Sequence, residues 1–84
     1  MIGVEKACEI ATTDRNEPFV DTITDVGYGF VIGTVAKNGD IAEQFPVLVY
    51  KDSGKAETFR VPEFLEELGN GKSVRIPPKY LFRK

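Results

Sequence analysis

Residues 46–61, PVLVYKDSGKAETFRV, decide the fold class of this chain. The apolar residues at 47–50 form a continuous run, which is typical of a central strand that is buried on both faces. Ser53 and Gly54 then supply the residue types of a tight turn, and residues 56–61 return as a second strand. The stretch therefore predicts a β-hairpin, around which the remaining segments are placed.

The segment before the hairpin predicts one helix and a further strand. Over residues 3–13 the apolar positions follow the i, i+3, i+4, i+7 spacing of a helix that buries one side, namely Val4, Ala7, Cys8 and Ala11. Residues 26–36 alternate as a strand, whereas residues 19–24 fit either a short strand or a packed loop. The glycines at 27, 29 and 33 indicate a bulge, a bend or a closely packed helix beside that strand.

The segment after the hairpin predicts a short second helix. Pro62 suits the first position of a helix over residues 62–68, and Gly69 suits its end. Residues 74–76 are apolar enough to add a short edge strand before the two prolines at 77 and 78.

Together these patterns predict an α+β fold. We expect an antiparallel sheet of three or four strands, with the N-terminal helix packed on one face and a short second helix after the hairpin. Residues 1–71 form the single α+β domain, and residues 72–84 form a basic C-terminal strand or arm that packs on this domain or extends from it. The expected core comprises Val4, Ala7, Cys8, Ala11, Phe30, Ile32, Val47, Val49, Phe59, Phe64, Leu65 and Leu68.

The chain lacks the residue types of a self-contained active site. It contains no His, which excludes Ser-His-Asp and Cys-His mechanisms, and the single cysteine, Cys8, cannot build a thiolate zinc site. Ser53 is explained by the hairpin turn, and the glutamates at 63, 66 and 67 by the solvated face of the second helix. We therefore predict a protein that is not an enzyme, with no catalytic, cofactor-binding or metal-binding residue.

The sequence also gives an expectation about the cellular compartment of the protein. No apolar run approaches the roughly 18–20 residues of a membrane helix, and the charges of Glu5, Lys6 and Glu9 do not fit a signal peptide. A single cysteine offers no internal disulfide, which favours a reducing environment. We expect a soluble, cytoplasmic protein with no membrane partner.

Charge is distributed unevenly along the chain. Residues 1–71 hold all thirteen acids and six bases, a net charge of −7, whereas residues 72–84 hold five bases and no acid, a net charge of +5. The overall charge of −2 therefore hides an acidic body and a basic C-terminal segment.

The basic C-terminal segment supplies the partner-binding candidates. Cations and aromatic rings alternate there, as they do on proteins that bind single-stranded nucleic acid. The alternatives are a segment that docks a protein partner, and an arm whose Tyr80, Leu81 and Phe82 pack on the core while its cations lie on the acidic face; we favour the last. The candidates are Arg75, Lys79, Tyr80, Phe82 and Arg83.

The hairpin region also resembles a known family. Residues 45–55, FPVLVYKDSGK, and residues 61–68, VPEFLEEL, follow an N-terminal helical segment and the aromatic pair at Tyr28 and Phe30, in the order typical of the YrhB-like, immunity-protein-35 family. The resemblance covers residues 3–68. It implies a small cytosolic α+β protein that binds and neutralises a cognate toxin without catalysis, and it transfers no defined functional residue.

Two functions from different classes fit these observations. The first is a small non-catalytic protein-binding module, with an immunity-type inhibitor of a cognate toxin as its specific form. An acidic body suits a basic partner such as a nuclease. The second is a nucleic-acid-associated accessory protein that uses the basic aromatic C-terminal segment. A homodimer formed through an exposed edge strand at 74–76 is a further expectation.

Overall fold

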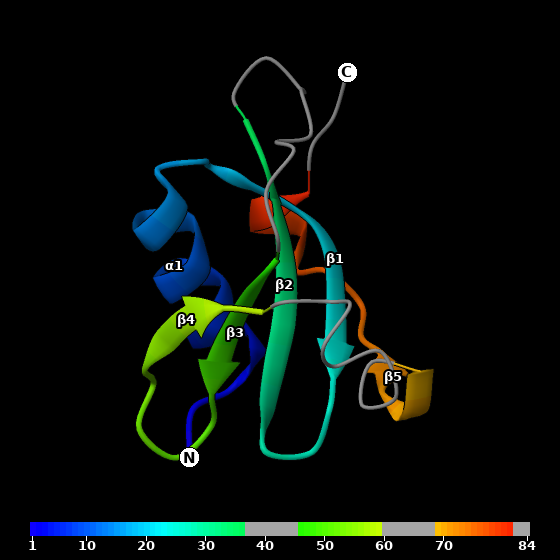
Figure 1. Ribbon diagram of the computed structural model, residues 1–84. Coiled ribbons are helices and arrows are strands. Elements are labelled where there is room, and N and C mark those ends of the chain that lie inside the picture. The colour runs from blue at the N-terminus through cyan, green and yellow to red at the C-terminus, as the bar shows by residue number, and fades with distance from the viewer. Residues whose placement is uncertain (37–45, 60–68, 82–84) are drawn as a thin grey trace.

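A computed structural model describes residues 1–36, 46–59 and 69–81. They form one N-terminal helix, α1, and a five-stranded antiparallel sheet of order β4-β3-β2-β1-β5 (Figure 1). The four strands β1 to β4 follow one another as a meander, and β5 returns to the free side of β1. The predicted α+β class is confirmed, although the sheet has five strands rather than three or four.

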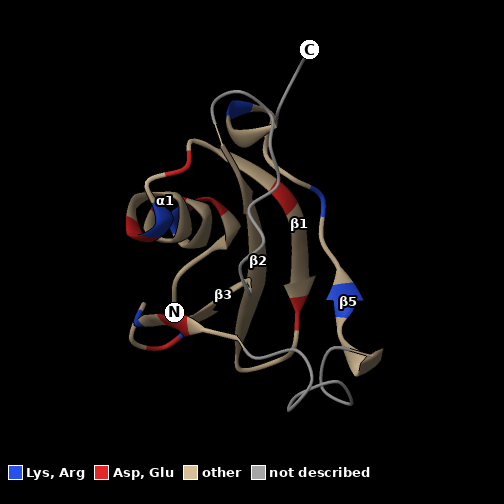
Figure 2. Ribbon diagram, turned by 45° about the horizontal axis from the view of Figure 1, so that its top comes forward, with Lys and Arg blue, Asp and Glu red and all other residues tan. Residues whose placement is uncertain are grey.

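The helix α1 spans Val4–Arg15, two residues beyond its predicted end. Asn16 ends it in the left-handed conformation, with φ of 55°, and the backbone N–H of Asn16 bonds the Thr13 carbonyl. Ala7, Cys8 and Ala11 are fully buried along one side of the helix. Because these side chains are small, the helix approaches one face of the sheet closely (Figure 2).

The predicted hairpin is confirmed. It joins β3 (Val47–Tyr50) to β4 (Ala56–Thr58), and Val49 pairs with Ala56 in the antiparallel register. Gly54 takes a φ of 73°, and its N–H bonds the Tyr50 carbonyl at 2.8 Å to close the turn. The returning strand is shorter than the expected 56–61, and residues 60 and 61 lie outside the described residues.

The ambiguous segment at 19–24 is a strand. It forms β1 (Phe19–Asp25), which pairs with β2 (Gly29–Val35) through a register shift between Val20 and Thr22. The shift lies opposite Gly33, where a Cβ would come within 2.8 Å of the Thr22 hydroxyl oxygen. The expected bulge is therefore present, but the extra residue belongs to the neighbouring strand.

The edge strand is displaced from its predicted position. β5 spans Lys72–Ser73 instead of residues 74–76, and it pairs with the end of β1. A 3-10 turn, η1 (Pro78–Tyr80), follows, and Leu81 then forms a parallel bridge with Val20. Residues 72–81 of the arm therefore pack on the domain. The second helix predicted over 62–68 lies outside the described residues, although Gly69, its expected end, is itself helical.

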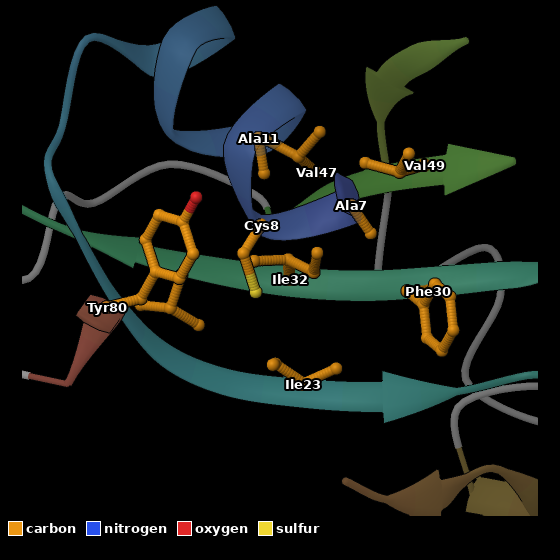
Figure 3. Close-up of a cluster of buried hydrophobic side chains, with 10 residues drawn as sticks. Ala7, Cys8, Ala11, Ile23, Phe30, Ile32, Val47, Val49 and Tyr80 are labelled. Carbon is orange, nitrogen blue, oxygen red and sulfur yellow. The ribbon is translucent and has the colours of Figure 1, made fainter. Parts of the chain in front are cut away.

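The core lies on both sides of the sheet. Under α1, Ile32 and Val49 from the sheet meet the helix, and Tyr80 reaches the same cluster from η1 (Figure 3). On the opposite face, Val31, Leu48 and Phe59 form a second cluster. Of the predicted core, Val4 is partly buried, and Phe64, Leu65 and Leu68 lie outside the described residues. The predicted residues that are buried are Ala7, Cys8, Ala11, Phe30, Ile32, Val47, Val49 and Phe59. Buried residues absent from the prediction are Val20, Ile23, Val31, Val35, Leu48 and Tyr80.

The burial of Tyr80 predicts that the C-terminal arm stabilises the fold. Tyr80→Ala removes an aromatic ring from a packed cluster, and we expect unfolding to become easier by about 3 kcal/mol in urea. Lys79→Ala, at the exposed neighbouring position, is the matched control and should change stability by less than about 0.5 kcal/mol. Equal stabilities for the two variants would show that the arm does not pack on the domain.

Candidate functional site

The predicted partner-binding residues of the C-terminal segment differ in their exposure to solvent. Arg75 and Lys79 are exposed, whereas Tyr80 is only 7% exposed and belongs to the core. Tyr80 therefore cannot offer its ring to a nucleic-acid base, which corrects its assignment as a surface residue. Phe82 and Arg83 lie outside the described residues.

What remains of that prediction is a basic row of three exposed side chains, Lys72, Arg75 and Lys79, along the β5 side of the sheet (Figure 2). Lys79 places its ammonium 5.3 Å from the centroid of the Tyr80 ring. Within the described part of the chain, no ion pair includes any of the three cations. Lys72 nevertheless lies opposite Asp25 in the β1–β5 ladder, and its charge contributes to lowering the pKa of Asp25, as expected for a cation on the acidic body.

A groove lies at the opposite edge of the sheet, between α1 and β4. It has a volume of about 350 Å³, and half-buried Ile10 and Ala56 provide its apolar part. Glu9 and Asp14 stand at its rim, and both are exposed. Each acid has a basic neighbour on the helix, Lys6 at 3.5 Å from Glu9 and Arg15 at 3.8 Å from Asp14. The Lys6–Glu9 pair is exposed and stabilises little, so a partner's cation can replace Lys6. The Arg15 side chain is only 16% exposed and also donates to the Thr58 hydroxyl at 3.2 Å.

Among the described residues, no strand pairs with the outer edge of β4, the strand beside this groove. The Tyr50 N–H bonds the Lys55 carbonyl at 2.9 Å, and the Phe59 N–H bonds the Pro46 carbonyl at 2.8 Å. Because inward and outward groups alternate along an antiparallel strand, the backbone groups of Ala56 and Thr58 face away from β3. β4 is the last strand of the sheet on this side, so the N–H and C=O groups of these two residues face outward from the sheet edge.

A second polar site ties the ends of three strands together. The Lys51 ammonium donates to both carboxylate oxygens of Asp25, at 2.8 and 3.0 Å, and lies 4.9 Å from the centroid of the Phe30 ring. The Gly27 N–H bonds the same carboxylate at 2.8 Å. The Lys51 side chain is only 15% exposed, so loss of Asp25 would leave a largely buried cation without its partner.

These contacts set the ionisation of Asp25. The hydrogen bond from Lys51, followed by that from the Gly27 N–H, lowers the pKa of Asp25 below its ordinary value. A lowered pKa in the folded state means that the charged carboxylate stabilises the fold at neutral pH. That contribution is lost as the pH falls through the lowered pKa.

The other reactive groups have structural explanations. Cys8 is fully buried, and burial, together with nearby Glu5, raises the pKa of its thiol to about 11, which keeps it protonated and unreactive. Ser53 accepts a hydrogen bond from the Lys55 N–H within the hairpin turn. Among the described residues, no three His, Cys, Asp or Glu side chains group as metal ligands, and no helix is long and apolar enough to cross a membrane.

Comparison with known proteins adds no assignment. No family model, no curated protein and no solved structure matches the chain. The resemblance of the hairpin region to the YrhB-like, immunity-protein-35 family therefore stays a prediction.

The Lys51–Asp25 pair yields a prediction about stability and pH. Asp25→Asn removes the charge that balances Lys51, and we expect a loss of about 1 kcal/mol at pH 7, since the pair is partly exposed. As the pH is lowered through the depressed pKa of Asp25, the wild-type carboxylate also becomes protonated, and the difference in urea midpoint between the two proteins should disappear. A difference that persists unchanged at low pH would show that the loss comes from shape and not from charge.

Proposed function

We propose that this chain is a small non-catalytic protein-binding module that receives an extended, basic segment of a partner protein along the free edge of β4. The observation that carries the proposal is the pairing of an open strand edge with an adjacent groove. Main-chain hydrogen bonds to Ala56 and Thr58 would supply affinity, as in other complexes in which a peptide adds a strand to a sheet.

The groove supports the basic character of the partner. A lysine or arginine on the added strand can lay its aliphatic stem against Ile10 and Ala56. Its charged end then lies near Glu9 and Asp14 at the rim. The net charge of −7 over residues 1–71 attracts a basic partner at longer range and speeds encounter.

An immunity-type inhibitor is the specific form of this proposal. Its support is the resemblance of residues 3–68 and the acidic body, because a nucleic-acid-cleaving toxin presents a basic surface. Such an inhibitor acts by covering its target and needs no catalytic group of its own.

The partner segment can be located and then tested. A photo-crosslinking amino acid at Thr13, beside the groove, should capture the partner in the native host, whereas the same group at Ser53 in the hairpin turn should not. The captured segment, made as a peptide, is then titrated against the purified protein by calorimetry.

The proposal predicts a specific effect of proline in β4. Ala56 begins the strand and its N–H faces outward, so Ala56→Pro removes a donor to the partner while leaving the bonds to β3 intact. We expect at least about tenfold weaker peptide binding, the cost of roughly one main-chain hydrogen bond. Ala56→Ser keeps the N–H and should lose much less affinity than Ala56→Pro, since it changes only one small side chain of the groove. Unchanged binding by Ala56→Pro would contradict strand addition.

The basic row favours a second function, binding of single-stranded nucleic acid. Lys72, Arg75 and Lys79 are exposed and without ion pairs among the described residues. The burial of Tyr80 weakens this alternative, because base stacking normally supplies much of the affinity.

A salt titration tests the alternative. Three phosphate contacts to a single strand predict a slope of about −2 for the logarithm of the association constant against the logarithm of salt concentration. The measurement is fluorescence anisotropy of a labelled oligonucleotide. Replacing the three cations by serine should abolish that dependence, and no binding even at low salt would exclude the function.

A further inference from the structure

A cavity of about 330 Å³ lies where the turn between β1 and β2 meets β5. Its lining comes from three parts of the chain that are far apart in sequence. The end of β1 and the turn after it contribute Asp25, Val26 and Gly27, the residue after β3 contributes Lys51, and the C-terminal part contributes Asn70 and Lys72. In liquid water this volume holds about ten molecules, so a small polyatomic ion fits within it.

The cavity lining holds two cations, Lys51 and Lys72, and one acid, Asp25. Lys72 lies directly opposite Asp25 in the β1–β5 ladder and would ordinarily pair with it. Instead, both oxygens of Asp25 are bonded to Lys51, and one of them also accepts the Gly27 N–H. The acid is thus paired with Lys51. Lys72 also acts on Asp25 electrostatically, but it is exposed and forms no ion pair among the described residues.

We propose that this cavity binds a small oxyanion, a phosphate or carboxylate group, between Lys72 and Asn70. The Lys72 ammonium supplies the charge, and the Asn70 amide supplies a neutral donor. Lys51 and Asp25 compensate each other's charge at the back of the site, since two of the three Lys51 N–H donors are directed at the Asp25 carboxylate. The Asp25 carboxylate does not cancel the site, because its charge is matched by Lys51.

The site is distinct from the proposed docking edge. β4 and β5 are the two outer strands of the sheet, so the cavity lies at the other side of the molecule from the α1–β4 groove. The oxyanion site does not rest on the proposed function, and either can fail while the other holds. Because a single exposed lysine carries most of the attraction, we expect millimolar affinity for a free ion.

The test uses amide chemical shifts in ¹⁵N-labelled full-length protein. Sodium phosphate and, separately, sodium acetate are titrated against sodium chloride at constant ionic strength, so that general screening is held fixed. The expected result is saturable shifts at Gly27, Asn70 and Lys72, and the relative affinities of the two ions distinguish a phosphate site from a carboxylate site.

Two matched variants decide the assignment. Lys72→Gln keeps a polar, exposed side chain and should weaken binding at least tenfold, whereas Lys79→Gln, in the same basic row but away from the cavity, should bind as wild type. Thermal unfolding of both variants checks that β5 remains formed. Shifts that fail to saturate, or an equal loss in the two variants, would overturn the proposal.

Discussion

The burial of β2 on both faces is the constraint on which the rest of the structure depends. Ile32 points to α1 and is fully buried, while its neighbour Val31 points to the opposite cluster and is 3% exposed. A strand with two buried faces needs cover on each side and a paired neighbour on each edge. The small residues of α1 provide cover on one side, and β1 and β3 satisfy both edges of β2. With the centre of the sheet enclosed in this way, the outer strands β4 and β5 carry the accessible backbone and the unpaired charge.

This division explains why the two candidate surfaces differ in chemistry. At the β4 edge, the groove offers apolar side chains and carboxylates beside outward-facing backbone groups. At the β5 edge, Tyr80 packs in the core, whereas the neighbouring cation Lys79 lies at the surface. The short lengths of β4 and β5 limit uncontrolled pairing between copies of the chain, which is a common protection of sheet edges. Among the described residues, the core holds no buried polar or charged side chain.

The helix and the hairpin could be predicted from the sequence, because each is determined by residues that lie close together in the chain. The spacing of Ala7, Cys8 and Ala11 predicted the helix, and the apolar run with Ser53 and Gly54 predicted the hairpin. The sites depend instead on long-range pairing. Lys51 and Asp25 are 26 residues apart, and no spacing rule marks them as partners. Alternating cations and aromatics in the C-terminal segment look the same whether the ring faces solvent or the core, so the orientation of Tyr80 required the fold. β5 was misplaced for a related reason, because its pairing is set by the end of β1 and not by its own apolar residues.

Hydrogen exchange of the β4 amides shows whether this sheet edge is open. We expect the N–H groups of Glu57 and Phe59, which face β3, to exchange slowly, and those of Ala56 and Thr58 to exchange at rates close to those of an unstructured peptide. The contrast should hold in dilute solution at neutral pH. Equal protection of Ala56 and Glu57 would mean that the edge is already covered, and it would contradict a surface available to a partner strand.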